Sequence, residues 1–170
     1  AVVVGGTALA HGVHTWTFDV SNVQGGFCVG ILGTDRWGEV GVPHTSSFLR
    51  YKREPWRNDS ATRNIWSAMF DFKNSDAYTM EAGQTLQRHS IRARGRSPGL
   101  DQSTVKLTFD CSSGSLKAES YSGTTIYLES EVNVRQRSTF GGECRLICAS
   151  EGKTTFAVQS YSNEGRAHGE

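Results

Sequence analysis

The sequence VHTWTFDV, residues 13–20, is the clearest β-strand in the chain. Its even positions carry His14, Trp16, Phe18 and Val20, whereas its odd positions are mostly threonine and aspartate. Alternate side chains of a strand point to opposite faces, so this pattern gives one bulky, aromatic face and one mostly polar face. A glycine precedes the stretch and a serine–asparagine pair follows it, as is typical of turns. The stretch therefore predicts a strand that is buried on one side.

Further along the chain, short apolar runs alternate with turn residues. Residues 26–32, GFCVGIL, follow a glycine-containing turn and predict a strand buried on both faces. The segment Asp110–Gly114 predicts a tight hairpin turn. No segment keeps helical periodicity over three turns, although 57–69 has room for one short helical turn. Further strands are expected at 65–72, 87–93, 105–110, 115–118, 125–132, 143–149 and 154–159.

This order of elements predicts an all-β fold. Roughly ten short strands without long helices between them exclude a βαβ architecture and favour a sandwich of two antiparallel sheets. Two segments, 33–64 and 73–84, are expected to be loops, and a loop as long as the first is usually functional. We expect one domain over residues 1–160, followed by a polar, frayed tail over 161–170.

The composition fits a soluble globular protein. Of 170 residues, 36% are hydrophobic and 21% charged, and the net charge is +1. This charge gives no whole-molecule attraction to nucleic acid or an anionic membrane, and no run approaches the roughly 18 apolar residues of a membrane helix. Cysteines stand at positions 28, 111, 144 and 148, an even count that permits disulfides. We interpret them as reduced thiols, because most lie in apolar strand-like runs, and expect an intracellular protein, cytoplasmic or nuclear.

Several motifs, taken in order and spacing, resemble a SPRY (B30.2-like) domain. The family typically has a G-x-H-x-W strand, a V-G-V strand, a tryptophan-containing strand and an apolar strand that ends in aspartate before a Gly-x-Leu continuation. The matching segments are Gly12–Trp16, Phe27–Ile31, Asn64–Trp66, Val105–Asp110 with Ser113–Leu116, and Phe140–Cys144 for the closing strands. The family's usual proline-containing stretch is not evident. The resemblance spans Ala10 to Gln159.

The resemblance implies a twisted two-sheet antiparallel β-sandwich of the SPRY or concanavalin-like jelly-roll type, without catalytic activity. In members that bind short peptides, the contacts come from loops gathered at one edge. Carried over by position, these are residues 4–7, 48–56 and 139–142. The expected partner-binding residues are Val4, Gly5, Arg50, Tyr51, Arg53, Trp56, Phe140 and Gly141.

The most informative local feature is the segment Arg50–Arg57, RYKREPWR, with four cations and two aromatics in eight residues. Aromatic residues and arginine dominate binding hot spots, so the segment predicts a partner site in which Arg50 and Arg53 pair with acidic groups. The same mixture suits single-stranded nucleic acid, with bases stacked on rings and phosphates on cations. A solvated loop whose arginine stems cover aromatic faces has the same sequence pattern.

A second basic cluster keeps RNA or single-stranded nucleic acid as the alternative partner. The arginines of residues 88–96 share parity, so in a regular strand they line one solvent face. An edge strand protected by charge has the same pattern. The possible nucleic-acid patch consists of Arg57, Arg88, Arg92, Arg94 and Arg96.

Other chemistries have less support. His11 and His14, three apart in a strand, point to opposite faces and build no shared metal site, and we interpret His14 as a core residue with satisfied hydrogen bonds. Cys144 and Cys148 lack the C-x-x-C spacing of zinc or redox sites. No phosphate-binding glycine motif is present. Tryptophans in the expected loops, at 37 and 56, leave a carbohydrate-binding sandwich as a lesser alternative.

These residues predict recognition rather than chemistry. We expect a non-catalytic protein–protein interaction module that holds a peptide or protein partner through its edge loops. No cofactor, metal or catalytic residue is expected, and the module is expected to be part of a larger protein or complex. An RNA-binding sandwich would differ by losing affinity steeply with salt, because counterion release drives that binding.

Overall fold

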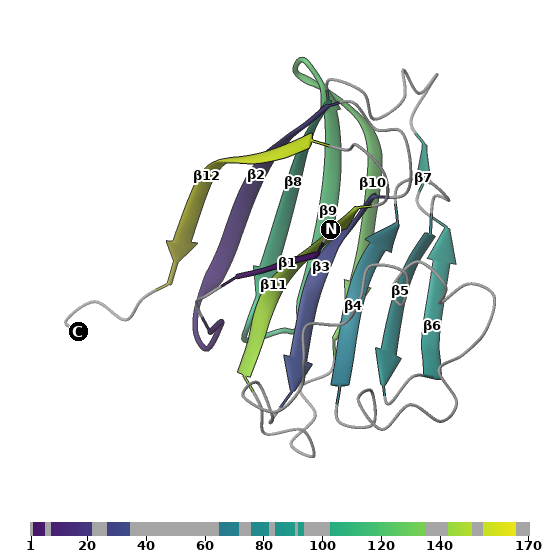
Figure 1. Ribbon diagram of the computed structural model, residues 1–170, viewed down its shortest axis with the longest axis vertical. Helices are drawn as coiled ribbons and strands as arrows, with labels where there is room; N and C mark the ends of the chain where they lie inside the picture. Colours follow the sequence, from purple (N-terminus) through teal and green to yellow (C-terminus); the bar gives the residue numbers. More distant parts are fainter. Residues whose placement is uncertain are drawn as a thin grey trace.

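The described residues of the chain form a sandwich of two six-stranded antiparallel sheets, seen in the computed structural model of Figure 1. The structure describes residues 2–5, 8–21, 27–34, 65–71, 76–81, 84–90, 92–93, 103–134, 143–150 and 155–165. This architecture confirms the all-β, two-sheet expectation. Within the described residues, no helix is long and apolar enough to cross a membrane.

The two sheets, here called sheet A and sheet B, are each built from strands distant in sequence. Sheet A has the order β1 (Val2–Val4), β11 (Glu143–Ser150), β3 (Phe27–Thr34), β4 (Ile65–Asp71), β5 (Asp76–Glu81) and β6 (Gln84–Ser90). Sheet B has the order β12 (Thr155–Glu164), β2 (Val13–Ser21), β8 (Ser103–Asp110), β9 (Ser115–Ser122), β10 (Thr125–Asn133) and β7 (Arg92–Ala93). The figure shows the first segment of the chain crossing the sandwich from β1 to β2.

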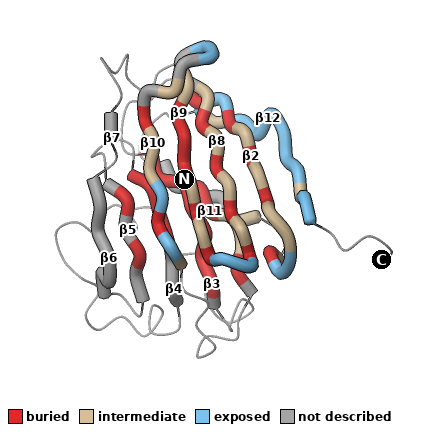
Figure 2. Tube along the Cα trace, turned by 180° about the vertical axis from the view of Figure 1, so that it is seen from behind, coloured by how far each residue is buried: buried red, intermediate tan, exposed pale blue. Residues whose placement is uncertain are grey.

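Strand β2 has the two faces that its alternation predicts. His14, Trp16, Phe18 and Val20 are all buried, whereas the threonines between them are half-buried and Asp19 is exposed. The buried face packs into a core shared by both sheets, with contributions from β3, β4, β8 and β9. Figure 2 shows this core as the buried positions that alternate along the central strands. The sequence pattern of β2 thus sets which side of sheet B faces sheet A.

The predicted hairpin at Asp110–Gly114 joins β8 to β9. The N–H of Gly114 donates to the carbonyl of Asp110 at 2.8 Å, and Gly114 has a φ of +73°, which favours glycine. The Asp110 carboxylate accepts hydrogen bonds from the Ser112 N–H at 2.8 Å, from the Ser112 hydroxyl at 2.7 Å and from the Ser113 N–H at 3.4 Å. These bonds favour the ionised form and lower the pKa of Asp110 from 3.8 to about 2.

This turn gives the hairpin a predictable acid sensitivity. Because the pKa of Asp110 is lower in the folded state, its stabilising contribution is complete above about pH 4 and is lost as the pH falls through about 2. The Asp110→Asn variant keeps the shape of the side chain and removes the charge. We expect the variant to be less stable than the wild type at neutral pH, with the gap closing as the pH falls to about 2. Urea unfolding of both proteins over this pH range measures the gap, and a constant gap would contradict the assignment.

Three strand expectations are corrected by the structure. The loop expected at 73–84 is wrong, because β5 lies within it and β6 begins at Gln84. The single strand expected at 87–93 is also wrong: β6 ends at Ser90 in sheet A, and β7 belongs to sheet B. Residues 161–164, expected to belong to a frayed tail, are part of β12, and residues 166–170 lie outside the described residues. Of the expected loop at 33–64, residues 35–64 lie outside the described part of the chain.

Candidate functional site

Among the side chains that the structure describes, the exposed large apolar ones lie on β12. Val158 is 54% exposed and Tyr161 is 48% exposed. All positions of β12 are exposed except Phe156 and Asn163, which are half-buried, and Figure 2 shows this exposure along the strand. A strand within a sandwich normally has one buried face, so β12 is open on both faces over most of its length.

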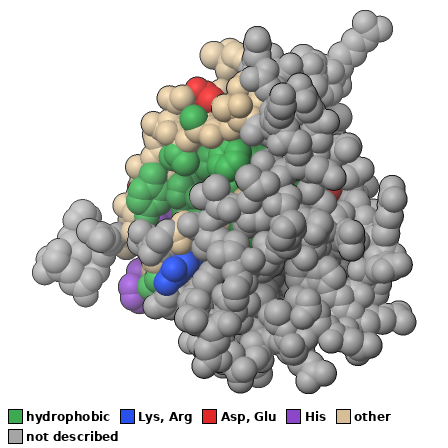
Figure 3. Space-filling view, in the orientation of Figure 1, with side chains coloured by type: hydrophobic (Ala, Val, Ile, Leu, Met, Phe, Trp, Pro, Cys, Tyr) green, Lys and Arg blue, Asp and Glu red, His purple; other side chains and the backbone are tan. Residues whose placement is uncertain are grey.

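The exposure of β12 follows from its place at the edge of sheet B. The start of β12 is anchored in the core, because the ring of Phe156 packs against that of Phe27 in β3, with ring centroids 5.7 Å apart. In Figures 1 and 2 the rest of β12 projects beyond the edge of sheet A formed by β1 and β11. Figure 3 shows hydrophobic side chains gathered on this side of the molecule, on the face of sheet B that the described strands of sheet A leave uncovered.

A β-bulge determines which side chains of β12 share that face. Val158 lies opposite Phe18 of β2 and Tyr161 lies opposite Trp16, with a register shift between Val158 and Ser160. Because Phe18 and Trp16 both point to the core side of sheet B, Val158 and Tyr161 also share that side although they are three residues apart. A bulge re-aims side chains in this way by adding one residue to one strand of a pair.

Tyr161 is held in place by two aromatic neighbours on β2. Its ring stacks on Trp16 with centroids 5.6 Å apart and on His14 with centroids 5.9 Å apart. The Nε2 atom of His14 lies 2.8 Å from the carbonyl oxygen of His11, which can only accept, so Nε2 carries the proton and donates. The Nδ1 atom then accepts from the Tyr161 hydroxyl at 2.7 Å.

The environment of His14 keeps it neutral. Burial lowers its pKa, and the bond to the His11 carbonyl opposes this effect more weakly. Both ring nitrogens have partners, which confirms the interpretation of His14 as a satisfied core residue. The histidine therefore positions the exposed tyrosine and is not itself presented to solvent.

Gly12, just before β2, lies close to the end of β12. It has a φ of +85°, and a Cβ at this position would overlap the side-chain oxygen of Asn163 and lie 2.6 Å from the carbonyl oxygen of Glu164. Only glycine lets the turn before β2 lie this close to the end of β12. The glycine, histidine and tryptophan of the G-x-H-x-W motif thus all serve the contact between β2 and β12.

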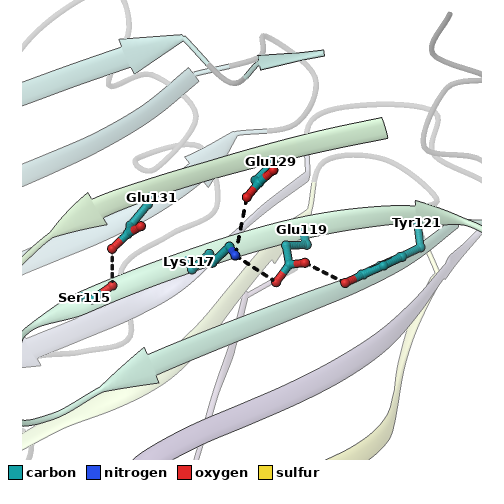
Figure 4. A network of polar contacts seen from close by, with 6 residues as sticks. All are labelled: Ser115, Lys117, Glu119, Tyr121, Glu129 and Glu131. Carbon is teal, nitrogen blue, oxygen red and sulfur yellow. Dashed lines mark hydrogen bonds and ion pairs between the residues drawn. The ribbon is translucent and has the colours of Figure 1, made fainter. Parts of the chain in front are cut away.

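The outer face of sheet B carries a polar network instead of apolar side chains (Figure 4). The Lys117 ammonium lies 3.7 Å from the Glu119 carboxylate and 3.4 Å from that of Glu129. Tyr121 donates to Glu119 at 2.6 Å, and this bond is the main reason that its pKa is raised to about 12. Ser115 donates to Glu131 at 2.5 Å. The groups satisfy one another, so the network fixes the surface of the β9–β10 hairpin.

The cysteine thiols are poor nucleophiles in this fold. All four cysteines are buried and present as thiols. Burial raises the pKa of both Cys144 and Cys148 to about 12, and the Cys144 thiol lies 3.4 Å from the carbonyl oxygen of Leu9. In the part of the chain that the structure describes, no group of three or more histidine, cysteine, aspartate or glutamate residues is placed to hold a metal ion.

The residues predicted to bind a partner are only partly described. Val4 ends β1 at the edge of sheet A, and the next N–H, that of Gly5, donates to the carbonyl of Leu146 at 2.8 Å. Arg50, Tyr51, Arg53, Trp56, Phe140 and Gly141 lie outside the described residues. Their role therefore stays a prediction.

The possible nucleic-acid patch stays a prediction as well, but its expected geometry changes. Arg88 lies in β6 of sheet A and Arg92 in β7 of sheet B, so shared parity no longer places them on one face. Arg57, Arg94 and Arg96 lie outside the described residues. Neither Val158 nor Tyr161 was among the predicted site residues: Val158 lies within the strand expected at 154–159, whereas Tyr161 lies beyond its expected end at Gln159, where the bulge interrupts the alternation.

Comparisons with solved structures place the fold more closely. The TRIM65 PSpry domain matches with a TM-score of 0.55 and 14% identity, over 94% of this chain and 70% of that one. The lectin from Bauhinia forficata in complex with GalNAc matches with a TM-score of 0.56 and 16% identity, over 93% and 76% of the two chains. The lectin UEA-II complexed with galactose matches with a TM-score of 0.57 and 11% identity, over 95% and 76%.

These matches define the class of the fold and no more. No protein-family model matches the sequence, and the search of curated proteins gives no match. The chain is a concanavalin-like sandwich, the fold that SPRY domains share with these lectins. At these low identities the likeness concerns the fold alone, so the binding partner has to be argued from the surface of this chain.

Proposed function

We propose that the chain is a non-catalytic protein-interaction module that binds an extended polypeptide along the free edge of β12. The observation that carries the proposal is the pair Val158 and Tyr161, both about half exposed, on the long edge strand of sheet B. Single exposed apolar residues are common, but here two large ones share one face beside a strand edge with which none of the described strands pairs.

An added strand would use the groups that this edge presents. The outward N–H and C=O groups of an edge strand pair with an extended peptide, and pockets or anchors for alternate side chains give specificity. Val158 and Tyr161 supply the anchors. Stacking on Trp16 and the hydrogen bond to His14 hold the Tyr161 ring in one orientation, which lowers the entropy lost on binding.

The proposed absence of catalysis has support from His14 beneath this surface and from two buried cysteines of sheet A. His14 is neutral, with both nitrogens engaged in hydrogen bonds, and therefore lacks a nitrogen for general acid–base work. The raised pKa values of Cys144 and Cys148 disfavour the thiolate that nucleophilic catalysis needs. Four buried thiols also support an intracellular site of action, where cysteines stay reduced.

A peptide selection tests the proposal. A displayed library of random peptides is selected on the immobilised chain, and the affinities of the recovered peptides are measured by fluorescence anisotropy. We expect extended, apolar peptides whose affinity falls at least about tenfold for the Val158→Lys variant, since the charge replaces a hot-spot anchor. The matched control is Thr124→Lys, which adds the same charge in the exposed turn between β9 and β10.

Two outcomes would overturn the proposal. Peptides that bind both lysine variants equally would place recognition away from β12. A library that gives no binder, while galactose or GalNAc binds the wild type, would replace the polypeptide with a carbohydrate. The control variant excludes a general effect of added charge on either result.

A further inference from the structure

We infer that the polypeptide accepted by β12 is the β12 strand of a second copy of this chain, paired antiparallel about a twofold axis. The inference rests on the proposed function and names the partner of the same edge. Its register places Val158 opposite Tyr161 of the partner subunit, and Tyr161 opposite Val158 of the partner subunit. The argument comes from the edge itself, from the bulge and from the charge along the strand.

The four edge strands of the two sheets differ in how they resist pairing. β1 and β7 have only three and two residues, and β6 carries Arg88 and His89 in its sequence. Short length and charge are the usual protections of an edge. β12 has ten residues, and its sequence TFAVQSYSN carries no charged residue or proline before Glu164. It is thus the edge with the least protection against another strand.

The exposed apolar pair is self-complementary in one register. In an antiparallel twofold pair centred between Gln159 and Ser160, residues whose numbers sum to 319 lie opposite each other, so 158 meets 161. Both side chains lie on the same face of β12, as their pairing with Phe18 and Trp16 shows. The two large apolar side chains that are exposed in the described part of one copy would therefore cover those of the other.

Neighbouring registers lose this match. Shifting by two residues brings Val158 opposite either Gln159 or Asn163 of the partner subunit, and Tyr161 then lies opposite Phe156 or Ser160. The bulge fits this register: two residues separate Val158 from Tyr161 in each copy, so the extra residue, Gln159, lies opposite Ser160 of the partner subunit and the two bulges face each other. On the opposite face, the small side chain of Ala157 meets that of Ser162, and no like charges approach each other.

The association is expected to be weak. A pair of ten-residue strands buries less than the roughly 1,200 Å² of a standard stable interface, so we expect a dissociation constant in the micromolar range or above. Since every residue occurs twice in a twofold interface, one substitution acts at two places. This makes the self-association sensitive to single changes on β12.

Sedimentation velocity between about 10 μM and 1 mM tests the inference. We expect the wild type to shift from monomer to dimer over this range, the Val158→Lys variant to dissociate at least about tenfold more readily, and the Thr124→Lys control to behave as the wild type. A wild type that stays monomeric up to about 1 mM, or a Val158→Lys variant that dimerises equally well, would overturn the inference.

The register is tested by cross-linking two singly substituted proteins of different mass. Ala157→Cys and Ser162→Cys are both exposed, and the register places them directly opposite, within disulfide range. In a dimer of one variant with itself, the two introduced cysteines would lie five residues apart along the paired strands. This is about 17 Å, which is too far for a disulfide. We expect mild oxidation of the mixture to give the mixed dimer, and predominant dimers of either variant with itself would exclude this register.

The two proposals fail separately. If the wild type is monomeric but the selected peptides still lose affinity for the Val158→Lys variant, the β12 edge binds polypeptide and the second copy is not its partner. If neither self-association nor peptide binding responds to that substitution, the edge is not a binding surface. The native thiols of Cys144 and Cys148 do not interfere, because both are buried with a pKa of about 12.

Discussion

Replacing Gly30 by alanine is expected to destabilise the chain by about 3 kcal/mol, the upper end of the usual cost of overpacking a core. Gly30 is buried in the middle of β3, where it pairs with Ile147 of β11 on one side and with Met69 of β4 on the other. A Cβ at this position would overlap the carbonyl oxygen of Ala68 and lie 2.9 Å from the Cα atom of Met69.

The size of this effect comes from the atoms that would have to move. The three atoms nearest to the added methyl group are backbone atoms of β4, so no change of side-chain rotamer relieves the overlap with them. The strands β3 and β4 would have to separate, and the core behind them, including Val29, Ile31 and Phe70, would lose its packing. Guanidinium unfolding of the wild type and the variant measures the difference.

Gly123 provides the matched control. It lies in the exposed turn between β9 and β10, has a φ of +63°, and a Cβ there would meet nothing within 4 Å. Gly123→Ala therefore carries only the cost of the left-handed backbone, about 1 kcal/mol. A Gly30→Ala variant that is as stable as Gly123→Ala would contradict this prediction, because it would show that β3 and β4 can separate with little loss of stability.

The central strands β2 and β3 could be predicted from the sequence. The run of residues 26–32 predicts a buried strand, and β3 is buried from Phe27 to Gly33. The alternation of residues 13–20 likewise predicts which face of β2 packs inward. In both cases the strand lies between two neighbours and large apolar residues mark its buried positions, so local sequence and tertiary packing agree.

Strand β5 was missed because its buried positions are small or polar. Of the side chains that the structure describes in Asp76–Glu81, Ala77 and Thr79 are buried, and neither gives the apolar signal by which strands are predicted. The break between β6 and β7 was missed for another reason. Whether a chain stays in one sheet or crosses to the other is decided by tertiary pairing, and β7 finds its partner in β10.

The candidate site on β12 could not be predicted from the sequence, because a β-bulge interrupts the alternation of its side chains. The bulge between Val158 and Ser160 shifts the inward positions from 156 and 158 to 161 and 163. A strict period of two then breaks at Gln159, and the polar sequence after it was expected to be a tail. Only the pairing with β2 shows that Tyr161 continues the inner face of the strand.

Replacing Phe18 by alanine is expected to cost about 3–5 kcal/mol, the range for removing a buried aromatic side chain. Phe18 is fully buried and lies between Val105 of β8 and Val158 of β12. Since domains are stable by roughly 5–15 kcal/mol, this loss brings the chain close to unfolding. Denaturant unfolding followed by tryptophan fluorescence measures it, because Trp16 is two residues away on the same buried face.

A substitution at the neighbouring Thr17 distinguishes the effect of a cavity in the core from a general effect of changing strand β2. It is on the opposite, half-buried face of β2, so Thr17→Ala tests the same strand without opening a cavity, and we expect a loss below about 1 kcal/mol. Equal losses for Thr17→Ala and Phe18→Ala would contradict the assigned faces. The same two variants also test the binding surface, because Phe18 of β2 lies directly opposite Val158 of β12. We expect the destabilised Phe18→Ala chain to lose peptide binding through β12 and the Thr17→Ala chain to keep it.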